Sequence, residues 1–161
     1  MTDYLISDDP DDVDLDLVWR FLSTEAYWHR WRTRADVATQ VAGAWRVVGA
    51  YERDGGAQVG FARAVSDGVA VAYLSDVFVL PEHRGHGLGK ALMAAMIDDG
   101  PGRDFRWMLH TNDAHGLYEA FGFVAPDEKY LERPYRMGRS GQEGLAPVLL
   151  GLDPGRAGPE S

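Results

Sequence analysis

The N-terminal part of the chain changes from an extended to a helical pattern of apolar residues. Residues 4–7 predict a short strand, and residues 14–23 repeat apolar side chains three and four positions apart, which predicts an amphipathic helix. A second short helix is expected over residues 23–31, because Ser23 and Thr24 are good N-cap residues and aromatic side chains follow them.

Helical spacing continues over residues 36–43, and two extended segments follow. Residues 45–67 predict a β-hairpin, with a Gly-Gly turn between two apolar runs. Residues 69–80 are almost continuously apolar, which is typical of a strand covered on both faces, so we expect this strand in the middle of the sheet. Pro81 ends it, because proline lacks the N–H that strand pairing requires.

Beyond a glycine-rich turn the two patterns alternate again. Residues 88–99 predict an amphipathic helix, and residues 105–111 predict a strand. A short helix is expected over residues 114–121, with Asp113 as its N-cap, and a last strand over residues 129–137. This order of elements predicts a layered α/β (α+β) fold with helices on the faces of a sheet.

Length and composition limit the domain organisation and the cellular setting. The chain has 161 residues, 45% of them hydrophobic, which suits one folded domain over residues 1–137. Residues 138–161 form a tail rich in glycine and proline, and we expect it to be mobile or to dock on a neighbour. No cysteine is present, and no run of apolar residues has the length of a membrane span, so we expect a cytoplasmic protein without membrane contact.

The charge of the chain bears on its partners. A formal net charge of −9 disfavours nucleic acid, whose phosphates are bound by positive surfaces, and favours cationic molecules. The sequence leaves the oligomeric state open, with a homodimer among the candidates. The histidines lack a supporting carboxylate pattern, so no metal site is predicted.

The segment "LPEHRGHGLGKAL", residues 80–92, predicts an anion site. It joins the end of a strand directly to a helix, where unpaired N–H groups and the positive end of the helix dipole meet. Arg84 and Lys90 add positive charge, and phosphate is the usual ligand of such a turn. The spacing does not fit a nucleotide P-loop or a dinucleotide fingerprint, because Gly85, Gly87 and Gly89 stand at alternate positions and no Ser or Thr follows Lys90.

Arg84, Gly87 and Gly89 match the pattern Arg/Gln-x-x-Gly-x-Gly/Ala, and here the sequence resembles the GNAT superfamily of N-acetyltransferases. The similarity runs through "DVFVLPEHRGHGLGKAL" and returns in "HGLYEAFGF", so that residues 45–124 follow the family order. This resemblance implies a mixed, mostly antiparallel, twisted sheet of about six to seven strands. It also implies that acetyl-CoA is bound and that its acetyl group is transferred to an amine.

The resemblance further implies roles for particular residues. The amides of Phe78 and Val79 are expected to polarise the thioester carbonyl, and Tyr118 to protonate the departing thiolate. Thr111 or Asn112 is expected to contact the pantetheine arm. The diphosphate is expected on the main chain of the loop, formed by Arg84, Gly85, His86, Gly87, Leu88, Gly89 and Lys90.

Asp76 is an acidic residue inside an apolar strand, where an ionised carboxylate is costly without a partner. Two interpretations are equally open: it orients or deprotonates a cationic amine, or it is a structural carboxylate. Tyr27, Trp28 and Trp31 lie in the segment that borders the acceptor cleft in similar proteins, so they can bind substrate or simply pack in the core. His110 and His115 are reserve bases.

These observations predict an N-acetyltransferase whose acceptor is a small cationic amine. A protein N-terminus or lysine is the second candidate acceptor, and an aminoglycoside-like amine is the third. The alternative of another class is a non-catalytic acyl-CoA-binding or regulatory module.

Overall fold

The computed structural model describes residues 3–29, 31–54 and 56–134. The strands of this part of the chain are β1 (Tyr4–Ser7), β2 (Arg46–Glu52), β3 (Gln58–Ser66), β4 (Val71–Val79) and β5 (Arg106–Met108). The α-helices are α1 (Leu15–Thr24), α2 (Arg34–Ala42), α3 (Leu88–Met93) and α4 (His115–Glu119). Short helices are the 3₁₀ turns η1 (Pro10–Asp12) and η2 (Pro81–His83), and the π-helical turn η3 (Ala94–Asp98), which continues α3.

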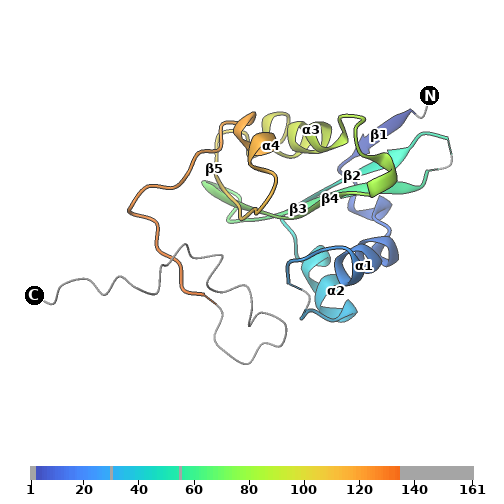
Figure 1. Cartoon of the computed structure of the whole chain (residues 1–161), viewed down its shortest axis with the longest axis horizontal. Coiled ribbons are helices and arrows are strands. Elements are labelled where there is room, and N and C mark those ends of the chain that lie inside the picture. The colour runs from blue at the N-terminus through green and yellow to red at the C-terminus, as the bar shows by residue number, and fades with distance from the viewer. Residues whose placement is uncertain (1–2, 30, 55, 135–161) are drawn as a thin grey trace, which may run out of the picture.

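The strands form one mixed sheet in the order β1-β2-β3-β4-β5. Neighbouring strands are antiparallel, except that β4 and β5 are parallel. The expected fold class is confirmed, with helices α3 and α4 above the sheet and α1 and α2 below it in Figure 1. The strand count differs from the expected six to seven, because the described residues contain five strands.

The last predicted strand accounts for part of this difference. Residues 129–134 have no regular secondary structure, and residues 135–137 lie outside the described residues, as does the predicted tail over residues 138–161. The hairpin of β2 and β3 is confirmed. β4 is an interior strand as expected, but β3 occupies the middle of the sheet.

Each face of the sheet buries its own hydrophobic cluster. On the face of α3, the buried side chains of Leu88, Leu92 and Met96 pack with the small residues of β3, such as Ala62 and Ala64. The opposite face packs α1 and α2 against the sheet, through Val18, Phe21, Leu22, Val37, Val47, Phe61 and Phe78. The predicted helix over residues 88–99 thus forms as α3 and η3, with its apolar stripe in the core.

The segment between α1 and α2 departs from the prediction. Ser23 and Thr24 close α1 rather than begin a new helix, and their hydroxyls donate to the carbonyl oxygen of Arg20. Residues 25–29 and 31–33 form no helix, and α2 begins only after Thr33, whose side chain forms a capping box with Asp36. The irregular α1–α2 segment contacts β4, because Trp28 and Arg32 both bind Asp76. Among the described helices, none is long and apolar enough to cross a membrane.

Candidate active site

A cleft opens where β4 runs on past β5. The two strands pair only from Val71 to Tyr73 of β4, and β4 then continues to Val79 while β5 ends at Met108. This half of β4 stays paired with β3 at its other edge, but toward β5 it faces an opening rather than a strand. The cleft is lined by Tyr27, Trp28, His29, Tyr73, Leu74, Ser75, Asp76, Val77, Leu109, His110, Thr111, Asp113, Ala114 and Tyr118.

Tyr118 is the buried aromatic residue that α4 contributes to the cleft. Burial is the main cause that raises the pKa of its phenol to about 12, and the charges of Tyr27 and Asp113 add to the effect. Beyond the end of α4, Gly122 has a φ of 84° and lets the N–H of Phe123 return to the carbonyl oxygen of Tyr118. Because its pKa is about 12, the phenol of Tyr118 keeps its proton well above neutral pH.

The start of α4 is not capped as predicted. Ala114 is its N-cap and makes no side-chain cap, whereas its N–H donates to Thr111 Oγ1 at 3.1 Å. Asp113 instead accepts a hydrogen bond from the hydroxyl of Tyr27 at 3.3 Å, and that hydroxyl accepts one from the N–H of Asn112 at 3.3 Å. These bonds tie the α1–α2 segment to the chain that follows β5, which holds Thr111 in the cleft wall.

The glycine loop leads from β4 into α3. Gly85 and Gly87 adopt left-handed φ angles of 81° and 76°, and a Cβ atom added at either would meet nothing within 4 Å. The main chain is therefore open to an approaching ligand. The first amides of α3 have no acceptor within the helix. Leu88 is buried, so it can offer a ligand only its backbone.

The predicted cationic side chains of the loop differ in what they do. Arg84 turns back on β4, and its Nε donates to the carbonyl oxygen of Val79 at 3.0 Å. Lys90 and His86 are exposed.

Phe78 of β4 stacks on Phe21 with ring centroids 3.9 Å apart, on the face of α1, so its side chain belongs to the core.

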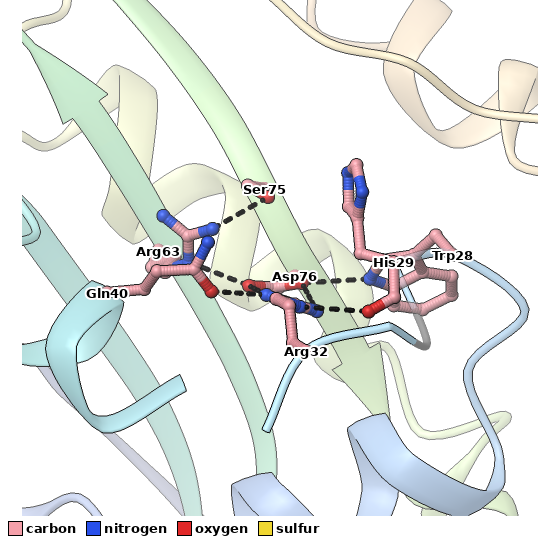
Figure 2. A network of polar contacts seen from close by, with 7 residues as sticks. All are labelled: Trp28, His29, Arg32, Gln40, Arg63, Ser75 and Asp76. Carbon is pink, nitrogen blue, oxygen red and sulfur yellow. Dashed lines mark hydrogen bonds and ion pairs between the residues drawn. The ribbon is translucent and has the colours of Figure 1, made fainter. Parts of the chain in front are cut away.

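Asp76 lies at the centre of a buried polar network, shown in Figure 2. Arg32 binds its carboxylate through two bonds, from Nη1 to Oδ2 at 2.8 Å and from Nη2 to Oδ1 at 2.9 Å. The Nε of Arg63 donates to Oδ2 at 2.7 Å, and the indole of Trp28 donates to Oδ1 at 2.8 Å. A carboxylate has about four acceptor positions, so these four donors occupy the group completely.

The pKa of Asp76 falls to about 2 in this environment. Burial alone would raise it, but the hydrogen bonds and charges of Arg32 and Arg63 outweigh that effect. The backbone of β4 is irregular at this residue. Asp76 has a φ of 53° and lies in a β-bulge where β4 has one residue more than β3. The bulge turns the carboxylate toward the α1–α2 segment.

The predicted aromatic residues separate into two groups. Tyr27 and Trp28 line the cleft, and their rings meet edge to face with centroids 4.9 Å apart. Trp31 is not among the cleft-lining residues of the described chain; it packs edge-on against His29 at 6.4 Å. Asn112 is exposed beside the cleft, whereas Thr111 lines it.

Two histidines line the cleft, and sequence reasoning identified one of them. His110 lies in the wall, whereas His115 is exposed on α4 outside it. His29 was not singled out, although it stands beside Trp28 in the segment expected to border the acceptor. Burial, followed by the charge of Arg32, lowers the pKa of His29, so its imidazole is neutral at neutral pH. Figure 2 shows its ring directed away from the Asp76 carboxylate.

Comparison with known proteins identifies the family. The family described as acetyltransferase (GNAT) domain matches residues 44–125, about half of the chain. A protein of Gibberella zeae, provisionally named an acetyltransferase, is 29% identical over 134 residues, which are 72% of this chain and 76% of that protein. A crystal structure from Xanthomonas campestris pv. campestris, assigned provisionally to the GNAT acetyltransferases, is 38% identical with a TM-score of 0.78 and covers 87% of this chain and 99% of its own.

More distant structures share the fold alone. Glucosamine-6-phosphate N-acetyltransferase from Arabidopsis thaliana is 13% identical, with a TM-score of 0.57 over 81% of this chain and 98% of its own. The matched domain, residues 44–125, contains the glycine loop and the elements from β2 to α4. The chain belongs to the GNAT acetyltransferase family.

Proposed function

We propose that this chain is an acetyl-CoA-dependent N-acetyltransferase that acetylates a primary amine by direct attack. The observation that carries the proposal is the position of Tyr118, a buried phenol of α4 in the wall of the cleft beside β4. A phenol that stays protonated can donate its proton to a departing thiolate. Membership of the GNAT family supports acyl transfer as the class of reaction.

Acetyl-CoA supplies the acetyl group as an activated thioester and carries a diphosphate. The glycine loop fits this diphosphate, because Gly85 and Gly87 leave the main chain open where side chains would otherwise stand. We assign the diphosphate to the amides of residues 85–90 at the beginning of α3, where N–H groups without helical acceptors face an anion. Arg84 and Lys90 add positive charge to the loop.

Two further contacts follow from the walls of the cleft. We assign the thioester carbonyl to a main-chain amide at Phe78 or Val79, on the part of β4 that runs past its last pair with β5. Thr111 lines the cleft, where its Oγ1 accepts a hydrogen bond from the N–H of Ala114, and we assign this side chain to the pantetheine arm. Asn112 lies beside it on the same side of the opening.

We propose that the acceptor is a small amine that is cationic in solution. Tyr27 and Trp28 supply aromatic surface in the cleft, and the exposed carboxylate of Asp113 supplies negative charge. Of the two roles that the sequence left open for Asp76, this proposal takes the structural one. Because its four acceptor positions are filled by protein donors, we assign it to positioning Trp28 and the α1–α2 segment rather than to binding the amine.

The test is release of free CoA thiol from acetyl-CoA against a panel of amines. The panel contains diamines and polyamines, an aminoglycoside, a peptide with a free N-terminus and a lysine peptide. We expect turnover with small cationic amines, and a decrease of about 10²- to 10⁴-fold in kcat for Tyr118→Phe. CoA binding by this variant, measured as the rise in melting temperature with ligand, should stay at the wild-type level.

Each result decides something definite. Turnover restricted to the peptides moves the acceptor to a protein amine and rejects the small-amine assignment. Saturable binding of acetyl-CoA without thiol release on any amine rejects the enzyme and identifies an acyl-CoA-binding module. A Tyr118→Phe variant with unchanged kcat rejects Tyr118 as the acid.

A further inference from the structure

Three side chains from three separate segments form a hydrogen-bonded series at the edge of the cleft. Tyr73 comes from β4, His110 follows β5, and Glu132 comes from the irregular segment after α4. The hydroxyl of Tyr73 lies 2.5 Å from Nδ1 of His110, and Nε2 of His110 lies 2.8 Å from Oε2 of Glu132. Tyr73 and His110 line the cleft, whereas Glu132 stands behind the imidazole.

The chemistry of the partners fixes the direction of these hydrogen bonds. A carboxylate only accepts, so Nε2 of the neutral imidazole must carry the hydrogen and donate it to Glu132. Nδ1 is then unprotonated and accepts from the hydroxyl of Tyr73. The arrangement has the same logic as a hydroxyl, histidine and carboxylate triad, in which the carboxylate selects the tautomer and stabilises the imidazolium.

The hydrogen-bonded series of Tyr73, His110 and Glu132 lies on the opposite side of the cleft from Tyr118. Tyr118 packs in the cluster beneath α3, together with Leu74 of β4. Tyr73 and Ser75 flank Leu74 in the strand, so their side chains point to the other face, where Ser75 meets Arg63 at 3.3 Å. Tyr118, which can give a proton, and Tyr73, which can pass one on, thus enter the cleft from opposite sides.

We propose that Tyr73, His110 and Glu132 form the proton relay that deprotonates the acceptor amine, an inference that rests on the proposed function above. The ammonium of the acceptor gives one proton to Tyr73 Oη as the Tyr73 proton passes to Nδ1 of His110. The imidazolium, paired with Glu132, then releases that proton to water, since the His110 side chain is 37% exposed. The attacking nitrogen loses a second proton, which balances the one given to the thiolate, and keeps its third in the amide.

In this assignment Tyr73 touches the substrate, whereas His110 and Glu132 act through it. The other titratable groups that line the cleft with His110 are His29 and Tyr27 of the α1–α2 segment, Asp113, Tyr118, and Asp76, which is paired with Arg32 and Arg63. His29 lies close enough to His110 for their charges to interact. A pH profile of the wild type alone therefore cannot assign a limb to His110, and variants are needed.

The first test does not depend on turnover. In ¹⁵N-detected NMR spectra of the imidazoles, we expect neutral His110 as the tautomer with hydrogen on Nε2 and a strongly downfield proton on that nitrogen. His110→Gln identifies the resonances. If the spectra show hydrogen on Nδ1 of neutral His110, the direction of proton transfer is reversed and the relay is overturned.

The second test separates the three members by kinetics with the best amine of the panel. We expect Tyr73→Phe to lower kcat by about 10²- to 10⁴-fold and His110→Gln by about 10-fold or more, with the KM for acetyl-CoA unchanged. Glu132→Gln keeps an acceptor for Nε2–H but removes the charge, so the acid limb of the kcat/KM profile should move to lower pH, since the imidazolium becomes harder to form. Glu128→Gln is the matched control, because Glu128 is an exposed residue of the same segment.

The outcomes distinguish the relay from the proposed function. Wild-type turnover that survives in Tyr73→Phe and His110→Gln overturns the relay and leaves the acetyltransferase standing. Absence of wild-type turnover on every amine overturns both. A Glu132→Gln profile that coincides with that of Glu128→Gln removes Glu132 from the relay.

Discussion

The carboxylate of Asp76 and the guanidinium of Arg32 form a two-bond ion pair, at 2.8 and 2.9 Å, with both side chains almost entirely removed from solvent. The pair joins the bulge of β4 to the irregular segment between α1 and α2. That segment carries Tyr27, Trp28 and His29 to the cleft. The buried pair therefore determines the position of one complete wall of the site.

We predict that Asp76→Asn strongly destabilises the fold. The substitution leaves Arg32 and Arg63 as buried cations without a counter-charge, and breaking a buried pair in this way costs about 3–5 kcal/mol. Denaturant unfolding measures the loss. Asp16→Asn is the matched control, because Asp16 pairs with Arg34 at the surface with its side chain 81% exposed, and such pairs contribute roughly 0–1 kcal/mol. Equal effects of the two substitutions would contradict the structural role of Asp76.

The same carboxylate predicts how stability depends on acid. The pKa of Asp76 is about 2 in the folded protein and about 3.9 in an unfolded chain, so between these values the unfolded state binds more protons. Its contribution of about 2 kcal/mol is therefore present above pH ~4 and is lost as the pH falls through about 2. Free energies of unfolding measured across this range should fall less steeply for Asp76→Asn than for the wild type. Parallel curves would contradict the low pKa.

The sequence predicted the parts of the site that depend on local spacing. The loop from Arg84 to Lys90, the stripe of α3 and the hairpin are all specified by residues within a few positions of one another, and all three formed. The family pattern pointed to Tyr118 on the same grounds. Local spacing also explains the error in α4, where Asp113 has good N-cap chemistry but its carboxylate is taken up by Tyr27.

The contacts that the sequence did not reveal join residues far apart in the chain. Asp76 binds Arg32, 44 positions away, and Arg63, 13 positions away. The sequence showed that an acidic residue lies in an apolar strand, but it did not show which residues pair with it. The same contacts explain why residues 25–29, within the helix predicted over residues 23–31, form no helix. Trp28 and Arg32 both bind Asp76, and His29 between them takes a left-handed φ of 49°, which no helix allows.

We predict that Gly87→Ala weakens CoA binding in addition to its cost to the fold. The methyl group meets no protein atom, so the cost to folding is the backbone strain of a positive φ, about 1–3 kcal/mol. In the loop, however, the methyl group enters the space assigned to the diphosphate and disturbs the amides around it. We expect the Kd for CoA, measured by calorimetry, to rise about 10-fold or more, which corresponds to about 1.4 kcal/mol.

Gly56→Ala is the control for this substitution. Gly56 also has a positive φ, 69°, and open space around it, but it lies in the turn between β2 and β3. The two variants should therefore lose similar free energies of unfolding, while Gly56→Ala keeps the wild-type Kd. Identical Kd values for both variants would place the diphosphate elsewhere.

We predict that Tyr118 contributes almost no tyrosinate absorbance at about pH 11, where an ordinary phenol with a pKa of about 10 is largely ionised. Its pKa of about 12, which arises mainly from burial, keeps most of the phenol protonated at that pH. The ultraviolet difference between the wild type and Tyr118→Phe should therefore be a small fraction of the absorbance of one equivalent of N-acetyltyrosine amide. Circular dichroism at the same pH checks that both proteins remain folded. A difference equal to one full tyrosine would mean that burial does not raise the pKa of the phenol and that Tyr118 is not shielded from solvent in the cleft.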